Sequence, residues 1–227
     1  MIKAVIFDLD GTLITFTLDV KACRTQVLQY LTEQGFPSSL FSMKETAFDM
    51  LVKAKKYMIT HRVKELNFAE IEKKVYSIVE GFELEATRKT EMFPGIPETL
   101  KALKSMNLKI GLCTISGAKA TKSVLQRFGL EEFFDAVIVR EDVSEVKPDP
   151  LHLNAVLDAL KVGVQETVLV GDSVKDMVCA NSLNVLAVGV TTGLSSADDL
   201  TLSGAHYVAS SANDIPSLIL QLKKQDY

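Results

Sequence analysis

The stretch "AVIFDLDGTLI", residues 4–14, contains both an apolar strand and the first candidate site residues. Four apolar residues run directly into Asp8 and Asp10, which a single leucine separates, and Gly11 follows them. Asp and Gly are common in turns for backbone reasons alone, so a surface turn is the simplest explanation of this stretch in isolation. A turn does not need two acids, however, and the rest of the chain has to decide.

The composition bounds the class of protein. A chain of 227 residues fits one large domain, or a core domain with a smaller inserted one. Hydrophobic residues make up 47% and charged residues 24%, which excludes a disordered or fibrous chain. The net charge of −4, with Lys and Arg spread along the sequence, argues against the basic surface of a nucleic-acid-binding protein. We therefore expect no nucleic-acid partner.

The cysteines and the N-terminus suggest a compartment. Cys23, Cys113 and Cys179 lack metal-binding spacing such as C-x-x-C, which favours buried, reduced thiols. The chain starts with Met1, Ile2 and Lys3 and then enters an apolar strand, which is not the pattern of a signal peptide. Apolar runs of about 18 residues, as a membrane span requires, are also missing. We expect a cytoplasmic protein with no membrane partner, and we leave its oligomeric state open.

Six short runs rich in Val, Ile and Leu predict the strands of a parallel sheet. The runs are continuous rather than alternating, as strands covered by helices on both faces require. They are "KAVIFDL" (3–9), "LKIGLCTI" (108–115), "DAVIV" (135–139), "TVLVGDS" (167–173), "NVLAVGV" (184–190) and "AHYVAS" (205–210).

Stretches with helical spacing lie between the later runs. In one of them Val124, Leu125 and Phe128 recur at helical intervals, and Gly129 follows as a C-cap. Alternating strands and helices predict an α/β fold with a doubly wound, Rossmann-like parallel sheet. Ligands of such sheets bind beyond the carboxyl ends of the strands, near a switch in strand order. The helical stretches are 96–106, 118–129, 150–161, 175–183 and 213–224.

Residues 16–89 break this alternation. They contain no clear strand, but Val20, Cys23, Val27 and Leu31 share a helical face, and a second such pattern runs from Ile71 to Val79. A coiled coil is the competing explanation, but no heptad persists long enough to favour it. We predict a core domain of residues 1–15 and 90–227 and an all-helical insert of residues 16–89. Its position after the first strand suggests a cap beside the carboxyl edge of the sheet.

Polar residues follow four of the predicted strands. Each has a simpler explanation alone: Lys147 as a surface lysine, Thr114 as a helix N-cap, Asp172 and Asp176 as a cap and a first-turn acid. The predicted topology nevertheless brings all of them to one edge of the sheet. In chain order they are Asp8 and Asp10 after the first strand, Thr114 after the second, Lys147 in "VKPDP" after the third, and Asp172 and Asp176 after the fourth.

Four carboxylates at one edge would repel one another, so a divalent cation is the natural compensation. Asp172 and Asp176 are four residues apart, so both can face one point at the start of a helix. Oxygen ligands combined with a substrate phosphate suit Mg²⁺. The sequence therefore predicts Mg²⁺ as the cofactor.

With these four motifs in this order, the chain resembles the haloacid dehalogenase-like hydrolase superfamily. The matching residues are "DLDGT" (8–12), Thr114, Lys147 within "KPDP", and "GDSVKD" (171–176). The resemblance covers residues 1–15 and 90–227. By its position, the insert is similar to the family's helical cap, which points to the phosphatase branch of the phosphoglycolate phosphatase kind.

The resemblance implies two catalytic residues. Asp8 would be the nucleophile and form an aspartyl-phosphate, which splits hydrolysis into two easier steps. Asp10 would protonate the leaving oxygen and then activate water. Relatives that cleave carbon–halogen bonds differ at the position of Asp10, because a halide leaves without a proton. The presence of this acid favours phosphoryl transfer.

The resemblance also implies the binding residues. Gly11, Thr114, Ile115 and Lys147 would bind the phosphoryl group. The metal ligands would be Asp8, Asp10 through its carbonyl, Asp172 and Asp176.

One motif departs from the family. Its second motif often continues Thr-Asn, where this chain has Thr114, Ile115 and Ser116. Either Ser116 or the backbone would take over the contact of that Asn.

The expected function is that of a Mg²⁺-dependent phosphomonoester hydrolase acting on a small anionic phosphorylated metabolite. One alternative is a phosphomutase, which uses the same two aspartates but protects its phospho-enzyme from water. Another is a non-catalytic protein that binds a phosphate ligand. Phosphoglycolate, sugar phosphates, nucleoside monophosphates and pyrophosphate all stay open as substrates.

Overall fold

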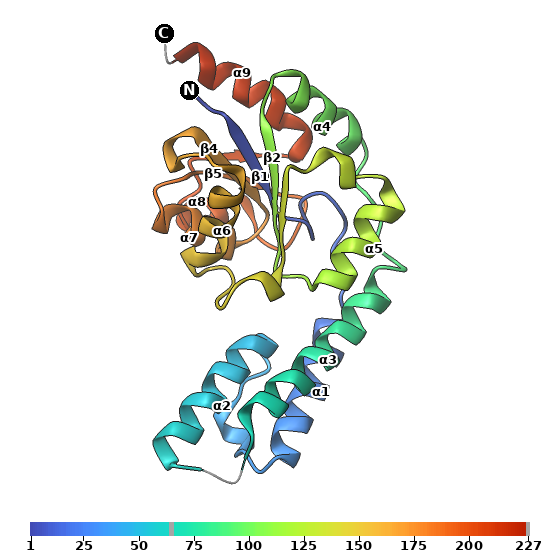
Figure 1. Ribbon diagram of the computed structural model, residues 1–227, viewed down its shortest axis with the longest axis vertical. Helices are drawn as coiled ribbons and strands as arrows, with labels where there is room; N and C mark the ends of the chain where they lie inside the picture. Colours follow the sequence, from blue (N-terminus) through green and yellow to red (C-terminus); the bar gives the residue numbers. More distant parts are fainter. Residues whose placement is uncertain (64–65, 226–227) are drawn as a thin grey trace. The chain divides into compact units, whose positions relative to one another are not determined.

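The structure, a computed structural model, describes residues 1–63 and 66–225. The chain forms two compact units: Met1–Phe16 together with Thr90–Tyr227, and Thr17–Lys89 (Figure 1). Residues 64–65 of the predicted insert and 226–227 of the predicted core lie outside the described residues.

The first unit is built on a six-stranded sheet in the order β3-β2-β1-β4-β5-β6. Every neighbouring pair is parallel, and the order changes direction at β1, the strand that ends just before Asp8. The predicted α/β fold with a doubly wound parallel sheet is confirmed. The strands are β1 (Ala4–Phe7), β2 (Lys109–Cys113), β3 (Ala136–Ile138), β4 (Thr167–Gly171), β5 (Leu186–Val190) and β6 (Tyr207–Ala209).

Helices cover both faces of this sheet, as Figure 1 shows. Successive strand residues point to opposite faces, so Val5 and Phe7 join the apolar core on one side and Ala4 and Ile6 the core on the other. Burial on both faces explains why the strands are continuous apolar runs. The first core is closed by α4 (Ile96–Ser105), α5 (Ala118–Phe128) and α9 (Ile215–Gln225), and the second by α6 (Pro150–Leu160), α7 (Val174–Ser182) and α8 (Ala197–Leu202).

Local signals set the helix ends near the site. The helix α5 ends at Gly129, whose φ of 64° is the left-handed conformation that glycine adopts easily, as predicted. The helix α7 begins at Ser173, whose side chain caps the backbone N–H of Asp176. The helix α8 was not predicted, because six residues are too few to show a periodic apolar face. Short 3₁₀ turns occupy Ser38–Leu40, Glu131–Phe133, Arg140–Asp142, Val164–Glu166 and Ala212–Asp214.

The second unit consists of α1 (Val20–Glu33), α2 (Ala47–His61) and α3 (Phe68–Ala86). Cys23, Val27 and Leu31 of α1 are buried in one apolar cluster with residues of α3, among them Val75 and Val79. These are the positions whose spacing predicted helices. In residues 17–63 and 66–89 the structure contains no strand.

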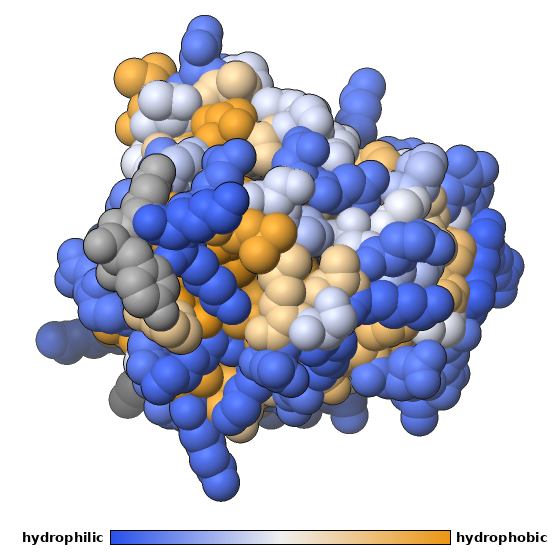
Figure 2. Space-filling model, turned by 90° about the horizontal axis from the view of Figure 1, so that it is seen from above, coloured by the Kyte–Doolittle hydropathy of each residue, from blue (hydrophilic) through white to orange (hydrophobic). Residues whose placement is uncertain are grey.

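The character of the surface and the state of the cysteines can be compared with what the sequence predicted. Hydrophilic side chains predominate on the face shown in Figure 2, with smaller apolar areas between them. Over the described part of the chain, we find no helix with the length and apolar character that a membrane span needs. The three cysteines are buried and form no disulfide, as predicted.

Gly111 in β2 lies directly against side chains of α6. A Cβ atom there would lie 2.7 Å from Cγ1 of Val156 and 3.0 Å from Cδ1 of Leu160. We expect Gly111→Ala to lower the free energy of unfolding by about 1–3 kcal/mol, because α6 must move away from the sheet. Urea titration followed by circular dichroism measures this.

The matched control is Gly81→Ala in α3, where an added Cβ meets nothing within 4 Å. This variant should be more stable by about 0.5–1 kcal/mol, because alanine is the better helix former. Equal effects of the two substitutions would contradict the packing argument.

Candidate active site

The site lies where β1, β2 and β4 end. Phe7 pairs with Leu112 of β2 on one side and with Val170 of β4 on the other, so all three strands end at the same edge. The N–H of Asp8 continues this pairing by donating to the carbonyl of Val170 at 2.8 Å. The loops that follow these strands therefore leave the sheet side by side and bring their polar side chains together.

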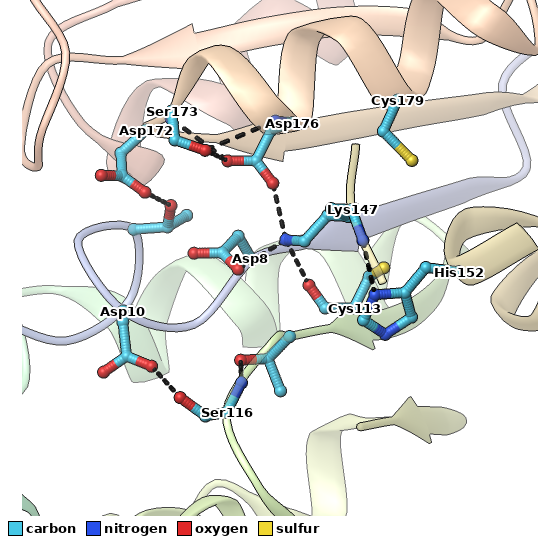
Figure 3. A network of polar contacts seen from close by, with 12 residues as sticks. Asp8, Asp10, Cys113, Ser116, Lys147, His152, Asp172, Ser173, Asp176 and Cys179 are labelled. Carbon is cyan, nitrogen blue, oxygen red and sulfur yellow. Dashed lines mark hydrogen bonds and ion pairs between the residues drawn. The ribbon is translucent and has the colours of Figure 1, made fainter. Parts of the chain in front are cut away.

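The ammonium of Lys147 is the centre of this site (Figure 3). Nζ donates to Oδ1 of Asp8 at 2.6 Å, to Oδ1 of Asp176 at 2.6 Å and to the carbonyl oxygen of Cys113 at 2.7 Å. The side chain is buried, so Lys147 is not a surface lysine. Burial alone would lower the pKa of Lys147, but the negative charges of Asp176 and Asp8 outweigh it and raise that pKa. Lys147 is therefore a permanent cation.

Asp176 is both a capping residue and a site residue. Its Oδ2 accepts hydrogen bonds from the N–H and the hydroxyl of Ser173, which close the capping box of α7. Its Oδ1 faces Lys147. Gly171 leaves the space for this carboxylate, because a Cβ there would lie 2.3 Å from Cγ of Asp176. Asp176 is thus the first-turn acid that the sequence offered as the simpler explanation, and its other carboxylate oxygen contacts Lys147.

Asp172 is enclosed by backbone from two loops. Its Oδ2 accepts a hydrogen bond from the N–H of Leu194 at 2.8 Å. A Cβ on Gly11 would lie 2.5 Å from Oδ2 of Asp172, and one on Gly193 would lie 1.9 Å from it. The hydroxyl of Thr192 also donates to the carbonyl of Gly11 at 2.6 Å. The loop after β5 therefore closes on the loop after β1 around this carboxylate.

Asp8, Asp172 and Asp176 form a compact acidic cluster. Each offers a carboxylate oxygen, and these three oxygens lie within 4.8 Å of one another. Burial raises the pKa of Asp8 well above its ordinary value. The ammonium of Lys147 lowers this pKa in part, and the negative charges of Asp176 and Asp172 raise it further. Burial and the charge of Asp176 likewise raise the pKa of Asp172 to about 6.

This acidic cluster fits a divalent cation. Three carboxylates against one ammonium leave the buried cluster negative. Burial first, and repulsion between the acids second, raise the pKa values of Asp8 and Asp172. Carboxylate oxygens are hard ligands of the kind that Mg²⁺ prefers. A bound cation would remove the repulsion and keep the three groups ionised.

Asp10 points to a different partner from Asp8. Its Oδ2 accepts a hydrogen bond from the hydroxyl of Ser116 at 2.6 Å, and both side chains are half-buried (Figure 3). The side chain of Asp10 is not part of the acidic cluster of Asp8, Asp172 and Asp176. The two acids of "DLDGT" are thus held apart by separate contacts.

The predicted phosphate-binding residues are placed as follows. Thr114 is buried at the end of β2, and its hydroxyl oxygen accepts the N–H of Ser116 at 3.1 Å; the N-cap of α5 is Gly117 and not Thr114. Ile115 is half-buried in the same loop. Gly11, also predicted to bind phosphate, donates its N–H to the carbonyl of Ile14 at 2.7 Å. Its positive φ of 87° and its closeness to Asp172 are further reasons for a glycine at this position.

No role was predicted from the sequence for His152, which in the structure binds the backbone of Lys147. His152 is fully buried in α6, and its Nδ1 accepts the N–H of Lys147 at 3.3 Å. Burial and the Lys147 ammonium lower the pKa of His152 to about 4, so the ring is neutral. Its position five residues after Lys147, at a helix start, was the available signal. No sequence signal pointed to the loop at Gly193, because this loop follows a strand to which no motif was assigned.

Comparisons with known proteins identify the family of this chain. A model of the family described as haloacid dehalogenase-like hydrolase matches residues 5–190. The chain belongs to the haloacid dehalogenase-like hydrolase family. The family, the fold class and the enzyme class predicted from the sequence are thereby confirmed.

Relatives extend over nearly the whole chain of this haloacid dehalogenase-like protein. It is 27% identical over 225 residues to a phosphoglycolate phosphatase of Vibrio vulnificus, which covers 96% of each chain. It is 26% identical over 224 residues to a pyrophosphatase of Halalkalibacterium halodurans, covering 96% of this chain and 97% of that one. A solved hydrolase from Pseudomonas syringae has a TM-score of 0.69 at 22% identity, covering 96% of this chain and 98% of that one. This last likeness supports the fold.

Removing the ammonium of Lys147 should destabilise the protein. We expect Lys147→Met to lower the free energy of unfolding in EDTA by about 3–5 kcal/mol, because Asp8 and Asp176 lose their buried counter-charge. Denaturant titration measures this. Lys104→Met, which breaks a more exposed ion pair with Asp135, is the control and should cost about 1 kcal/mol or less. A loss for Lys147→Met no larger than the control's would refute a central role for this cation.

The neutral His152 should make stability depend on pH. Its folded pKa of about 4 lies below the ordinary 6.5, so the unfolded chain takes up the proton first as the pH falls. The contribution of neutral His152 to the free energy of unfolding is therefore fully present above pH 6.5. It is lost as the pH falls from 6.5 to 4, by up to about 3 kcal/mol. The non-titrating variant His152→Asn should lose correspondingly less stability over this range. Parallel stability–pH curves for the two proteins would contradict the assignment.

Proposed function

We propose that this protein is a Mg²⁺-dependent phosphomonoester hydrolase that works through an aspartyl-phosphate. The observation that carries the proposal is the separate placement of two acids at the end of β1. Asp8 lies in the buried acidic cluster with Lys147, and Asp10 faces Ser116 outside that cluster. One carboxylate is thus placed to accept a phosphoryl group and the other to handle a proton.

Asp8 is the proposed nucleophile. Lys147 binds its Oδ1 at 2.6 Å, which fixes the carboxylate and leaves Oδ2 as the attacking oxygen. The ammonium also favours the ionised carboxylate, which is the nucleophilic form. When bound by Asp8, Asp172, Asp176 and the carbonyl of Asp10, Mg²⁺ would offset the charge of the transferring phosphoryl group.

The phosphoryl oxygens need further donors. Thr114 at the end of β2 offers its hydroxyl proton, since the oxygen of this group already accepts the N–H of Ser116. The backbone N–H of Ile115 completes the proposed set of donors. The ammonium of Lys147, whose three N–H bonds go to Asp8, Asp176 and Cys113, adds its positive charge. Donors placed in advance, where charge accumulates in the transition state, stabilise it more than water does.

Asp10 is the proposed acid and base. An alkoxide is a poor leaving group, so the leaving oxygen has to be protonated as the phosphoryl group moves to Asp8. The resulting carboxylate of Asp10 then takes a proton from the water that hydrolyses the aspartyl-phosphate.

The relatives suggest which substrates to try first. The proteins named above as a phosphoglycolate phosphatase and a pyrophosphatase make phosphoglycolate the first candidate and pyrophosphate the second. Both are small anions, in agreement with the proposed substrate class. We also propose that the helical unit, residues 17–89, is a cap that excludes water during the reaction.

Phosphate release from a panel of small phosphoesters tests the proposal. We expect release with Mg²⁺, none with EDTA, and a fall in kcat of at least about a thousandfold for Asp8→Asn, because the amide is not a nucleophile. Asp214→Asn, at a capping acid outside the site, is the control and should stay active.

Each other outcome points to a different function. Conversion of the substrate to an isomer without stoichiometric free phosphate would identify a phosphomutase. A folded protein that binds Mg²⁺ and phosphate but turns over no member of the panel would favour a binding role. Full activity of Asp8→Asn would exclude the aspartyl-phosphate.

A further inference from the structure

The hydrogen-bond donor to Asp10 comes from a distant part of the sequence. Ser116 lies 106 positions further along the chain, yet its hydroxyl donates to Oδ2 of Asp10 at 2.6 Å (Figure 3). This short contact joins the loop after β1 to the loop after β2. A hydrogen bond of this length restricts the rotation of the Asp10 side chain.

The loop that carries Ser116 is held on both sides of this residue. The N–H of Ser116 donates to Oγ1 of Thr114, and Nη1 of the buried Arg140 donates to the carbonyl of Ile115 at 3.2 Å. On the far side, Oε2 of Glu141 accepts the N–H of Ala118 at 2.9 Å. The backbone at Ser116 is therefore fixed, and its hydroxyl reaches Asp10 from a rigid support.

We propose that Ser116 is a positioning residue for Asp10, an inference that rests on the proposed function. By binding Oδ2, the Ser116 hydroxyl directs the other carboxyl oxygen, Oδ1, to the leaving oxygen of the substrate. In the first step the O–H bond of Asp10 breaks, and its proton goes to the leaving alkoxide as the phosphoryl group bonds to Asp8. The Ser116 hydroxyl keeps its own proton throughout.

This role has a signature that a structural role lacks, namely dependence on the leaving group. An alkyl phosphate such as phosphoglycolate releases an alkoxide that needs the proton of Asp10. p-Nitrophenyl phosphate releases a phenolate that spreads its charge over the ring and leaves without protonation. Misplacing Asp10 should therefore slow the hydrolysis of phosphoglycolate much more than that of p-nitrophenyl phosphate.

The experiment compares kcat/KM for the two substrates in Mg²⁺, with wild type beside Ser116→Ala. This ratio of constants reports the steps up to release of the leaving group, so the later attack of water does not enter it. We expect a loss of about tenfold to a hundredfold for the alkyl phosphate, as for a displaced acid, and less than about threefold for p-nitrophenyl phosphate. Ser116→Thr, which keeps the hydroxyl, should restore the activity on the alkyl phosphate.

Two further variants complete the design. In an Asp10→Asn background, Ser116→Ala should cost less than about twofold on the alkyl phosphate, because the acid that it positions is already gone. Ser210→Ala removes a similar 2.6 Å contact, with Asp214, outside the site and should leave both substrates unaffected.

Three results would overturn the inference. Equal losses on both substrates would show that Ser116 supports the loop or the phosphate instead. An additional large loss in the Asp10→Asn background would show that it acts independently of Asp10. A wild-type protein that releases phosphate from neither these two substrates nor any other member of the panel would refute the proposed function itself and, with it, this role of Ser116.

Discussion

The buried ammonium of Lys147 joins three segments that are distant in sequence: the end of β1 at Asp8, the end of β2 at Cys113, and the first turn of α7 at Asp176. A lone ammonium in such a place would be very unfavourable, and so would two adjacent carboxylates. Each makes the burial of the other possible. The loops at the carboxyl edge of the sheet therefore depend on this shared charge for their arrangement.

The same edge is crowded with backbone. Glycines at positions 11, 171 and 193 each lie where a Cβ would collide with Asp172 or Asp176. Absence of a side chain lets the chain approach these carboxylates closely enough for the N–H of Leu194 to bind Asp172. The acids are thus enclosed by main chain rather than by large side chains, which leaves their oxygens close together for a cation.

The haloacid dehalogenase-like site keeps its two β1-terminal acids in different surroundings. Asp8 is buried among charges, whereas Asp10 is half-buried and accepts a hydrogen bond from the neutral hydroxyl of Ser116. Residues two apart share one face of a strand, but β1 ends at Phe7 and the chain bends at Leu9, so Asp8 and Asp10 no longer point the same way. This divergence allows one short motif to supply both a proposed nucleophile and a proposed proton donor.

The sequence by itself determined the sheet, most of the helices of the α/β unit, and the four motifs at the strand ends. Continuous apolar runs require burial on both faces, and helical periodicity is a local property, so both can be read without the fold. The helix α8 was not predicted, because six residues are too few to show a helical period. The convergence of Asp8, Lys147, Asp172 and Asp176 followed from the predicted topology alone.

Only the tertiary structure decided the partners of these residues. Hydrogen bonds such as those from Ser116 to Asp10 and from Leu194 to Asp172 link positions whose separation in sequence carries no signal. The amide of Gly11 is likewise committed to Ile14 by the shape of one turn. Residue type and order place a group at the sheet edge, but the angle at which it leaves its loop depends on packing between distant segments.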